Sequence, residues 1–143
     1  MRILVSACLL GIPCRYDGAA RTFERILALR ERHELIPVCP EQLGGLPTPR
    51  APSEIHNGRV VTRAGEDNTE AFLRGAGCAL SIFQTLSCDL AILRAKSPSC
   101  GLCEIYDGTF SRTLTSGDGL TASALKNANA RVLRDDDPQI ASL

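Results

Sequence analysis

The chain contains four short apolar runs, each of which predicts a buried β-strand. They cover residues 2–7, 34–38, 89–93 and 131–133. Between the runs, apolar residues recur every three or four positions, which is the spacing of an amphipathic helix. These predicted helices cover about residues 22–33, 67–86 and 120–128. Strands that alternate with helices favour parallel pairing with crossover helices. We therefore expect an α/β fold: a single three-layer domain with a short, mostly parallel, Rossmann-like sheet flanked by helices.

The helix boundaries follow from capping signals. Thr22 is a suitable cap for the first helix, and Asp67 with Glu70 three residues later forms a capping-box pattern before the longest helix. Small and apolar residues share one face of that helix, so we expect it to approach the sheet closely. This predicted buried stripe consists of Ala71, Phe72, Gly75, Ala76, Ala79, Leu80, Phe83 and Leu86.

The connecting segments are polar or rich in proline and glycine. Residues 39–55 contain four prolines and a Gly-Gly pair, which predicts a stiff loop without regular helix or central strand. Asn57-Gly58 predicts a turn before a short edge strand at 59–62. Residues 97–108 should be a further loop. We expect residues 1–134 to form the domain and residues 135–143 to be a loose C-terminal tail.

Length and charge restrict the classes of partner. A chain of 143 residues is the size of one ordinary domain, and its formal net charge is zero. Neutrality predicts no binding to duplex nucleic acid and no attraction to an anionic membrane. The apolar run before Cys8 is too short for a signal peptide, and no run approaches the roughly 20 residues of a membrane span. We expect a cytoplasmic protein; the pattern indicates no particular oligomeric state.

The number and positions of the cysteines indicate a candidate site. The chain has seven cysteines, and an odd number argues against a closed disulfide framework and for metal binding or thiol chemistry. Cys8, Cys39 and Cys100 each follow a predicted strand. Because the carboxyl ends of parallel strands lie at one edge of a sheet, the three thiols should face a common point. That arrangement is typical of a soft-metal or iron–sulfur site.

The other cysteines leave alternatives open. Cys78 and Cys88 are best interpreted as small buried apolar residues. Cys100 and Cys103 form a Cys-x-x-Cys pair, which occurs in redox sites and in zinc sites. A closed zinc site could use Cys103 with the three cysteines above, whereas three thiolates on a cluster leave one iron open. Cys14 and Cys103 are possible reserve ligands.

Polar residues accompany the three cysteines. Glu41 is a candidate general acid/base, with a solvated or ion-paired surface glutamate as the alternative. Two serines, on either side of a proline, offer hydroxyls to water or to a substrate carbonyl, or simply stabilise a turn. Three cations suit an anionic or carbonyl group, or pair with nearby carboxylates. The serines are Ser97 and Ser99, and the cations are Arg15, Arg50 and Lys96.

Several of these motifs, taken together, resemble a known family. They are VSACLLG at residues 5–11, RYDG at 15–18, PVCPE at 37–41, GGLPTPR at 44–50 and SPSCG at 97–101. Their order and their spread over nearly the whole chain resemble the domain of unknown function 523 family, which includes the thiouracil desulfidases. Cys14 and Cys103 are thiols that this resemblance does not assign.

The resemblance implies a 4Fe-4S cluster held by Cys8, Cys39 and Cys100, with the fourth iron open as a Lewis acid. It also implies Glu41 as acid/base and Ser97 as a catalytic serine. Arg15, Arg50, Lys96 and Ser99 remain candidates for substrate binding. The implied reaction removes sulfur as sulfide from a thiolated small molecule such as 2-thiouracil, by addition of water and without net redox change. Iron suits this chemistry because sulfur is a soft ligand.

Two rival functions remain at this stage. The first is a non-catalytic metal-binding module, holding zinc or an iron–sulfur cluster. The second is transfer of sulfur or electrons from a cluster to a protein partner.

Overall fold

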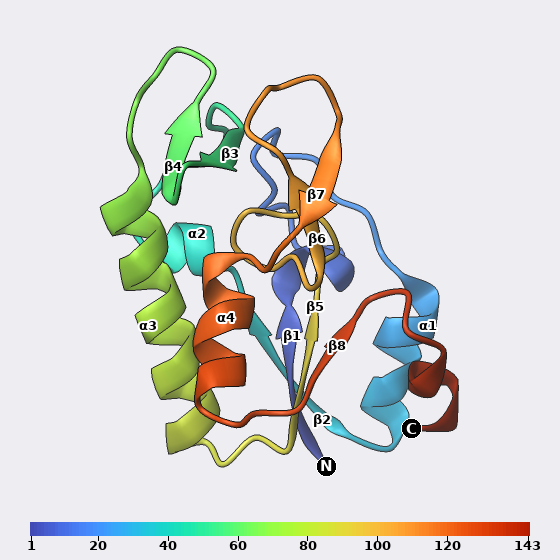
Figure 1. Ribbon diagram of the computed structural model, residues 1–143. Helices are drawn as coiled ribbons and strands as arrows, with labels where there is room; N and C mark the ends of the chain where they lie inside the picture. The colour runs from blue at the N-terminus through green and yellow to red at the C-terminus, as the bar shows by residue number, and fades with distance from the viewer.

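A parallel sheet forms the centre of the molecule. The computed structural model describes residues 1–143, and its main sheet contains β1 (Arg2–Ser6), β2 (Glu34–Val38), β5 (Leu90–Leu93) and β8 (Val132–Arg134). The strand order is β2-β1-β5-β8 and all three pairings are parallel (Figure 1). The predicted α/β sheet is therefore confirmed.

Helices cover both faces of this sheet. Helix α1 (Glu24–Leu27), which continues as a 3-10 turn (Ala28–Glu31), lies on one face, and α3 (Thr69–Thr85) and α4 (Leu120–Asn127) lie on the other (Figure 1). The chain leaves β1 in one direction towards β2 and later crosses back to β5. Strand order thus reverses between β1 and β5, and ligands of doubly wound sheets bind beside such a point.

Two apolar cores follow from the alternation of side chains along the strands. Ile3 and Val5 of β1 face α1 with Ile26 and Leu29, whereas Leu4 faces the opposite layer. Strand β5 is apolar throughout, and its four residues are all buried. Burial on both faces explains this run, since a central parallel strand has no solvent side.

The helix ends differ in detail from the predictions. Helix α1 begins at Glu24 after Phe23, and Thr22 instead pairs with Leu10 in an isolated bridge. Helix α3 begins at Thr69, whose backbone N–H donates to the Asp67 carboxylate at 2.9 Å. No helix of the chain combines the length and the apolar character needed to cross a bilayer.

The prediction that residues 39–55 lack regular structure was wrong at two places. Pro40 to Leu43 form a one-turn helix, α2, because proline is tolerated in the first turn, where its missing N–H would have no partner. Residues Ser53–His56 form β3, which pairs through the Asn57-Gly58 turn with β4 (Arg59–Thr62). The turn and the second strand of this hairpin agree with the prediction.

A second hairpin stands beside the first (Figure 1). It consists of β6 (Glu104–Tyr106) and β7 (Leu114–Ser116). Neither strand was predicted, and β6 lies within residues 97–108, which were expected to be a loop. All three residues of β7 are exposed, so the sequence offers no apolar alternation there. The two hairpins lie outside the main sheet, above the carboxyl ends of its strands.

The C-terminal residues were expected to be loose, and this is wrong. Residues Pro138–Ser142 form a 3-10 turn, and Ile140 is 3% exposed because it packs into the core beneath α1. His33 ties the two ends of the chain: its Nδ1 lies 3.2 Å from the Met1 ammonium and its Nε2 lies 3.0 Å from the Leu143 carbonyl oxygen. Ile140, Leu143 and the contact of the Leu143 carbonyl with His33 thus hold the segment against the core.

Candidate functional site

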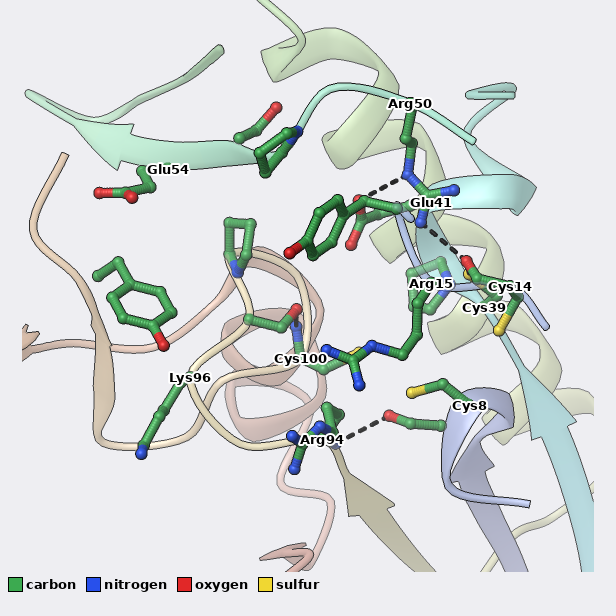
Figure 2. Close-up of a pocket in the computed structure, with 18 of the residues that line it drawn as sticks. Cys8, Cys14, Arg15, Cys39, Glu41, Arg50, Glu54, Arg94, Lys96 and Cys100 are labelled. Carbon is green, nitrogen blue, oxygen red and sulfur yellow. Dashed lines mark hydrogen bonds and ion pairs between the residues drawn. The ribbon is translucent and has the colours of Figure 1, made fainter. Parts of the chain in front are cut away.

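A cavity of about 380 Å³ opens at the carboxyl edge of the main sheet. Its floor comes from the segments that follow β1, β2 and β5, and its outer wall comes from the two hairpins. Figure 2 shows the cysteine side chains gathered on one side of this cavity and Glu54 of β3 on the other. The cavity thus lies where the strand order reverses, as expected for a doubly wound sheet.

The three predicted thiols all line this cavity. Cys8 lies in a 3-10 turn (Ala7–Leu9) directly after β1, Cys39 precedes α2, and Cys100 lies in the turn after β5. Cys100 is 5% exposed, and Cys8 and Cys39 are half-buried. The sheet therefore brings residues from three distant parts of the sequence to one place; their role as ligands stays a prediction.

Cys14 joins them. It lines the same cavity, is 2% exposed, and its thiol lies within hydrogen-bonding reach of the Cys39 and Cys8 thiols. The Cys39 thiol also reaches the Cys14 carbonyl oxygen, at 3.6 Å. The donor set of this cavity is thus four soft thiols, which fits an iron–sulfur cluster.

The pKa values of Cys14, Cys39 and Cys100 are all raised above the usual value of a thiol. Burial raises the pKa of Cys100 to about 12. The hydrogen bond with Cys39 lowers the pKa of Cys14, but the bond with Cys8 and burial outweigh it and raise this pKa to about 11. The bond with Cys14, together with burial, raises the pKa of Cys39. Binding of a metal group as thiolates would therefore release protons.

A single metal ion and a cluster place different demands on these side chains. No group of three or more His, Cys, Asp or Glu side chains in the chain is arranged to hold a metal ion. A single zinc ion requires all its sulfur ligands at about 2.3 Å from one point. In a cluster each thiolate binds a different iron, so the sulfur atoms do not have to converge on one metal ion.

Glu41 lies in the first turn of α2 and lines the same cavity as the four cysteines. Its Oε1 accepts a hydrogen bond from Arg50 Nε at 3.0 Å, and the side chains are 19% and 6% exposed respectively. Arg50 also donates to the carbonyl oxygens of Pro47 and Cys14, at 3.1 and 2.9 Å. Arg50 was expected to contact substrate, but these contacts make it the residue that holds Glu41 and the Cys14 segment in place.

The two serines of the SPSCG motif have different environments. Ser97 lines the cavity, and its Oγ accepts from the backbone N–H groups of Ser99 and Cys100, at 3.1 and 2.9 Å. A hydroxyl accepts about two hydrogen bonds and donates one, so only the Ser97 proton remains available. Ser99 is fully buried, and its hydroxyl pairs with Thr121 at 2.9 Å. The expectation that Ser99 contacts substrate was therefore wrong.

Helix α4 fixes this turn. The backbone N–H groups of Gly119, Leu120 and Thr121 donate to carbonyl oxygens of the turn, at 2.7 to 3.0 Å. A Cβ at Gly119 would lie 2.4 Å from the Ser99 carbonyl oxygen, so only glycine permits this approach. The orphan donors of the helix N-terminus are thus satisfied by the segment that carries Ser97 and Cys100.

The remaining predicted cations lie differently. Arg15 lines the cavity, its side chain makes no hydrogen bond or ion pair within the chain, and Figure 2 shows its guanidinium beside Cys100. Lys96 also lines the cavity, but its side chain is exposed and its amine points away from the thiols (Figure 2). Arg15 therefore brings an unpaired positive charge to one of the predicted cluster ligands.

Cys103 does not belong to this group. It is exposed and lines a separate shallow depression with Arg134 and Asp136. The second cysteine of the Cys-x-x-Cys pair therefore faces away from the first. This placement does not support Cys103 as a reserve ligand, nor the alternative of a closed four-thiolate zinc site.

Several lining residues were missed by the sequence analysis. Arg94 follows β5 directly, so its position at the carboxyl edge was a usable signal; Asp135 holds it with a bond of 2.6 Å to Oδ2. The others come from the hairpins, which carry no apolar pattern that would place them over the sheet. They are Glu54, Arg63, Tyr106, Phe110 and Arg112.

Comparison with known proteins adds three findings. A family model described as 2-thiouracil desulfurase matches residues 3–137. The chain is 41% identical over 145 residues to the uncharacterized protein YbbK of Bacillus subtilis (strain 168), covering 94% of this chain and 96% of that protein. The solved structure of the 4Fe-4S-dependent thiouracil desulfidase TudS (DUF523Vcz) is similar with a TM-score of 0.88 and 39% identity, covering 99% of this chain and 95% of that chain.

Proposed function

Because the chain belongs to the 2-thiouracil desulfurase family, as its motifs predicted, we propose that it is a 4Fe-4S-dependent desulfidase acting on a thiolated small molecule such as 2-thiouracil. The observation that carries this proposal is the convergence of Cys8, Cys39 and Cys100 in one cavity with Glu41 and Ser97. The cavity volume of about 380 Å³ is in the range of small-molecule sites.

Cys8, Cys39 and Cys100 would hold the cluster. They lie in the turns that follow three neighbouring strands, so the sheet brings them to one edge. A bound cluster with three protein ligands would supply an open iron, a Lewis acid with high affinity for sulfur. The same cavity wall carries the two residues that handle protons.

Glu41 would take the proton from the attacking water. Its Oε1 is engaged by Arg50, which fixes the direction of the carboxylate and leaves the second oxygen free of protein partners. The charge of Glu41 also raises the pKa of Cys100, after the larger effect of burial, and both residues line the same cavity. A carboxylate in this position can act as base and later as acid.

Ser97 would act as a hydrogen-bond donor. Since both acceptor positions of its oxygen are taken by backbone N–H groups, its proton points to whatever occupies the cavity. Arg15 adds an unpaired positive charge that suits a carbonyl oxygen of the substrate. Together the two groups would orient the ring and stabilise negative charge as it develops.

Anaerobic reconstitution with iron and sulfide tests the cofactor. We expect about four irons and four acid-labile sulfides per chain and sulfide release from 2-thiouracil. Cys100→Ala should lose iron and activity, whereas Cys103→Ala, its partner in the Cys-x-x-Cys pair, should keep both because Cys103 lies outside the cavity. A colourless protein with stoichiometric zinc would instead support the non-catalytic module.

The role of Glu41 is tested separately. Glu41→Gln should keep the iron content and visible absorbance but release sulfide at least about 100-fold more slowly, as for loss of a general acid/base. Normal sulfide release by this variant would remove Glu41 from the mechanism. Stable transfer of sulfur to a partner protein, with no free sulfide, would favour a carrier function.

A further inference from the structure

Phe110 and Arg112 have an unusual backbone. Both have positive φ angles, of 56° and 59°, although neither is glycine. Bulky residues rarely adopt this conformation, and it persists only where the surroundings hold it. Both residues line the outer wall of the cavity, in the loop between β6 and β7.

Glu54 and Arg63 of the other hairpin hold this loop from two sides. Glu54 Oε1 accepts from the backbone N–H of Gly108 at 3.0 Å and from that of Phe110 at 3.1 Å. Arg63 donates to the Phe110 carbonyl oxygen at 3.0 Å, and its guanidinium carbon lies 5.5 Å from the centre of the Phe110 ring. Both backbone polar groups of Phe110 are therefore engaged by the β3–β4 hairpin.

The backbone of the β6–β7 loop also approaches β3 closely at Gly108. Gly108 has a φ of +91°, and a Cβ there would lie 2.7 Å from the His56 Cβ and 2.8 Å from the Ile55 carbonyl oxygen. An isolated two-stranded hairpin is marginally stable in water. The two hairpins thus depend on each other, and the outer wall of the cavity depends on both.

We propose that Glu54 and Arg63 are positioning residues that hold Phe110 as an aromatic wall for a planar thiocarbonyl ring. This inference rests on the proposed function. Neither residue contacts the thiols or Glu41, so they affect how the substrate is held and not the chemical step. Arg63 covers one part of the Phe110 ring, which leaves its remaining surface to a flat ligand.

The test compares Glu54→Ala, Glu54→Gln and a control, Glu66→Gln, in the reconstituted enzyme. Glu66 is exposed, and its side chain makes no contact with the cavity. Glu54→Ala should raise KM for 2-thiouracil about ten-fold, as for loss of a hydrogen bond to a charged group, with kcat within about two-fold. Glu54→Gln should restore part of this loss, and the control should behave as wild type.

A double variant shows whether Glu54 acts through Phe110. Phe110→Ala should raise KM by itself, and adding Glu54→Ala should raise it no further, because the wall is already lost. Additive effects on KM, or an effect on kcat alone, would overturn the proposal. Visible absorbance and iron content should be unchanged in all variants.

Hydrogen exchange provides a readout that needs no activity. Peptides covering residues 108–113 should exchange faster in Glu54→Ala than in wild type, whereas peptides of β1 and β5 should not change. Unchanged exchange in the loop would overturn the proposed contact. If fully loaded wild-type enzyme released no sulfide from 2-thiouracil, the proposed function would fail, and the exchange result would still decide whether Glu54 holds the loop.

Discussion

Ser97 and Ser99 are two residues apart and have opposite surroundings. Ser97 lines the cavity and its Oγ accepts two backbone N–H groups, while Ser99 is fully buried against Thr121. The intervening proline fixes the backbone so that the two side chains point in different directions. One short motif thus places one serine in the cavity wall and binds the other serine to α4.

This division predicts different costs for two alanine variants. Ser99→Ala leaves the Thr121 hydroxyl without its partner and should lower the free energy of unfolding by about 1–3 kcal/mol, with sulfide release unchanged. Ser97→Ala should slow sulfide release about 100-fold or more. Urea unfolding of the reduced, metal-free protein and kinetics of the reconstituted enzyme give the two readings. Equal loss of activity in both variants would contradict the assignment.

At the scale of elements, α2 and α3 meet through two glycines. A Cβ at Gly44 would lie 2.0 Å from the Ala71 carbonyl oxygen, and one at Gly75 would lie 1.8 Å from the Pro40 carbonyl oxygen. The backbones therefore touch without side chains between them. Because Pro40 and Glu41 begin α2, this contact sets the position of the proposed acid/base with respect to the sheet.

Two glycines of α3 form a matched pair for a test. Gly75→Ala should lower the free energy of unfolding by about 1–3 kcal/mol, because the methyl group pushes α2 away. Gly77→Ala, whose Cβ would meet nothing within 4 Å, should raise it by about 0.5–1 kcal/mol through better helix propensity. Denaturant unfolding measures both. Destabilisation of similar size at the two positions would show that the α2 contact is not the cause.

At the scale of the whole molecule, the C-terminal residues close the layer that contains α1. Ile140 completes the core formed by β1, β5 and α1, and Asp135 ties the end of β8 to Arg94 in the cavity wall. The same short segment therefore contributes to the core and to the site. A truncated chain ending at residue 134 would lose both.

Ile140→Ala should lower the free energy of unfolding by about 2–4 kcal/mol, the usual cost of removing a large buried side chain. Gln139→Ala, at the exposed neighbouring position, should change it by less than about 0.5 kcal/mol. Thermal and urea unfolding of the metal-free protein provide the comparison. A wild-type midpoint for Ile140→Ala would mean that the segment does not support the core in solution.

The sequence by itself determined the central sheet and the meeting of the thiols. Short apolar runs alternating with helical spacing specify parallel strands, and the carboxyl ends of such strands share one edge, so Cys8, Cys39 and Cys100 had to approach one another. Binary patterning is a local property, and it is strong in buried strands such as β5. Family motifs then supplied candidate roles for Glu41 and Ser97.

Only the tertiary structure decided which neighbours share the site. Cys14 lines the cavity and Cys103 lies outside it. The Ser99 side chain is buried against Thr121, and Arg50 forms an ion pair with Glu41. The outer wall comes from hairpins whose exposed residues carry no periodic signal. The tail is held by Ile140 and Leu143, its two large apolar residues. The direction of a side chain in a loop depends on contacts with distant segments, and these contacts exist only once the chain has folded.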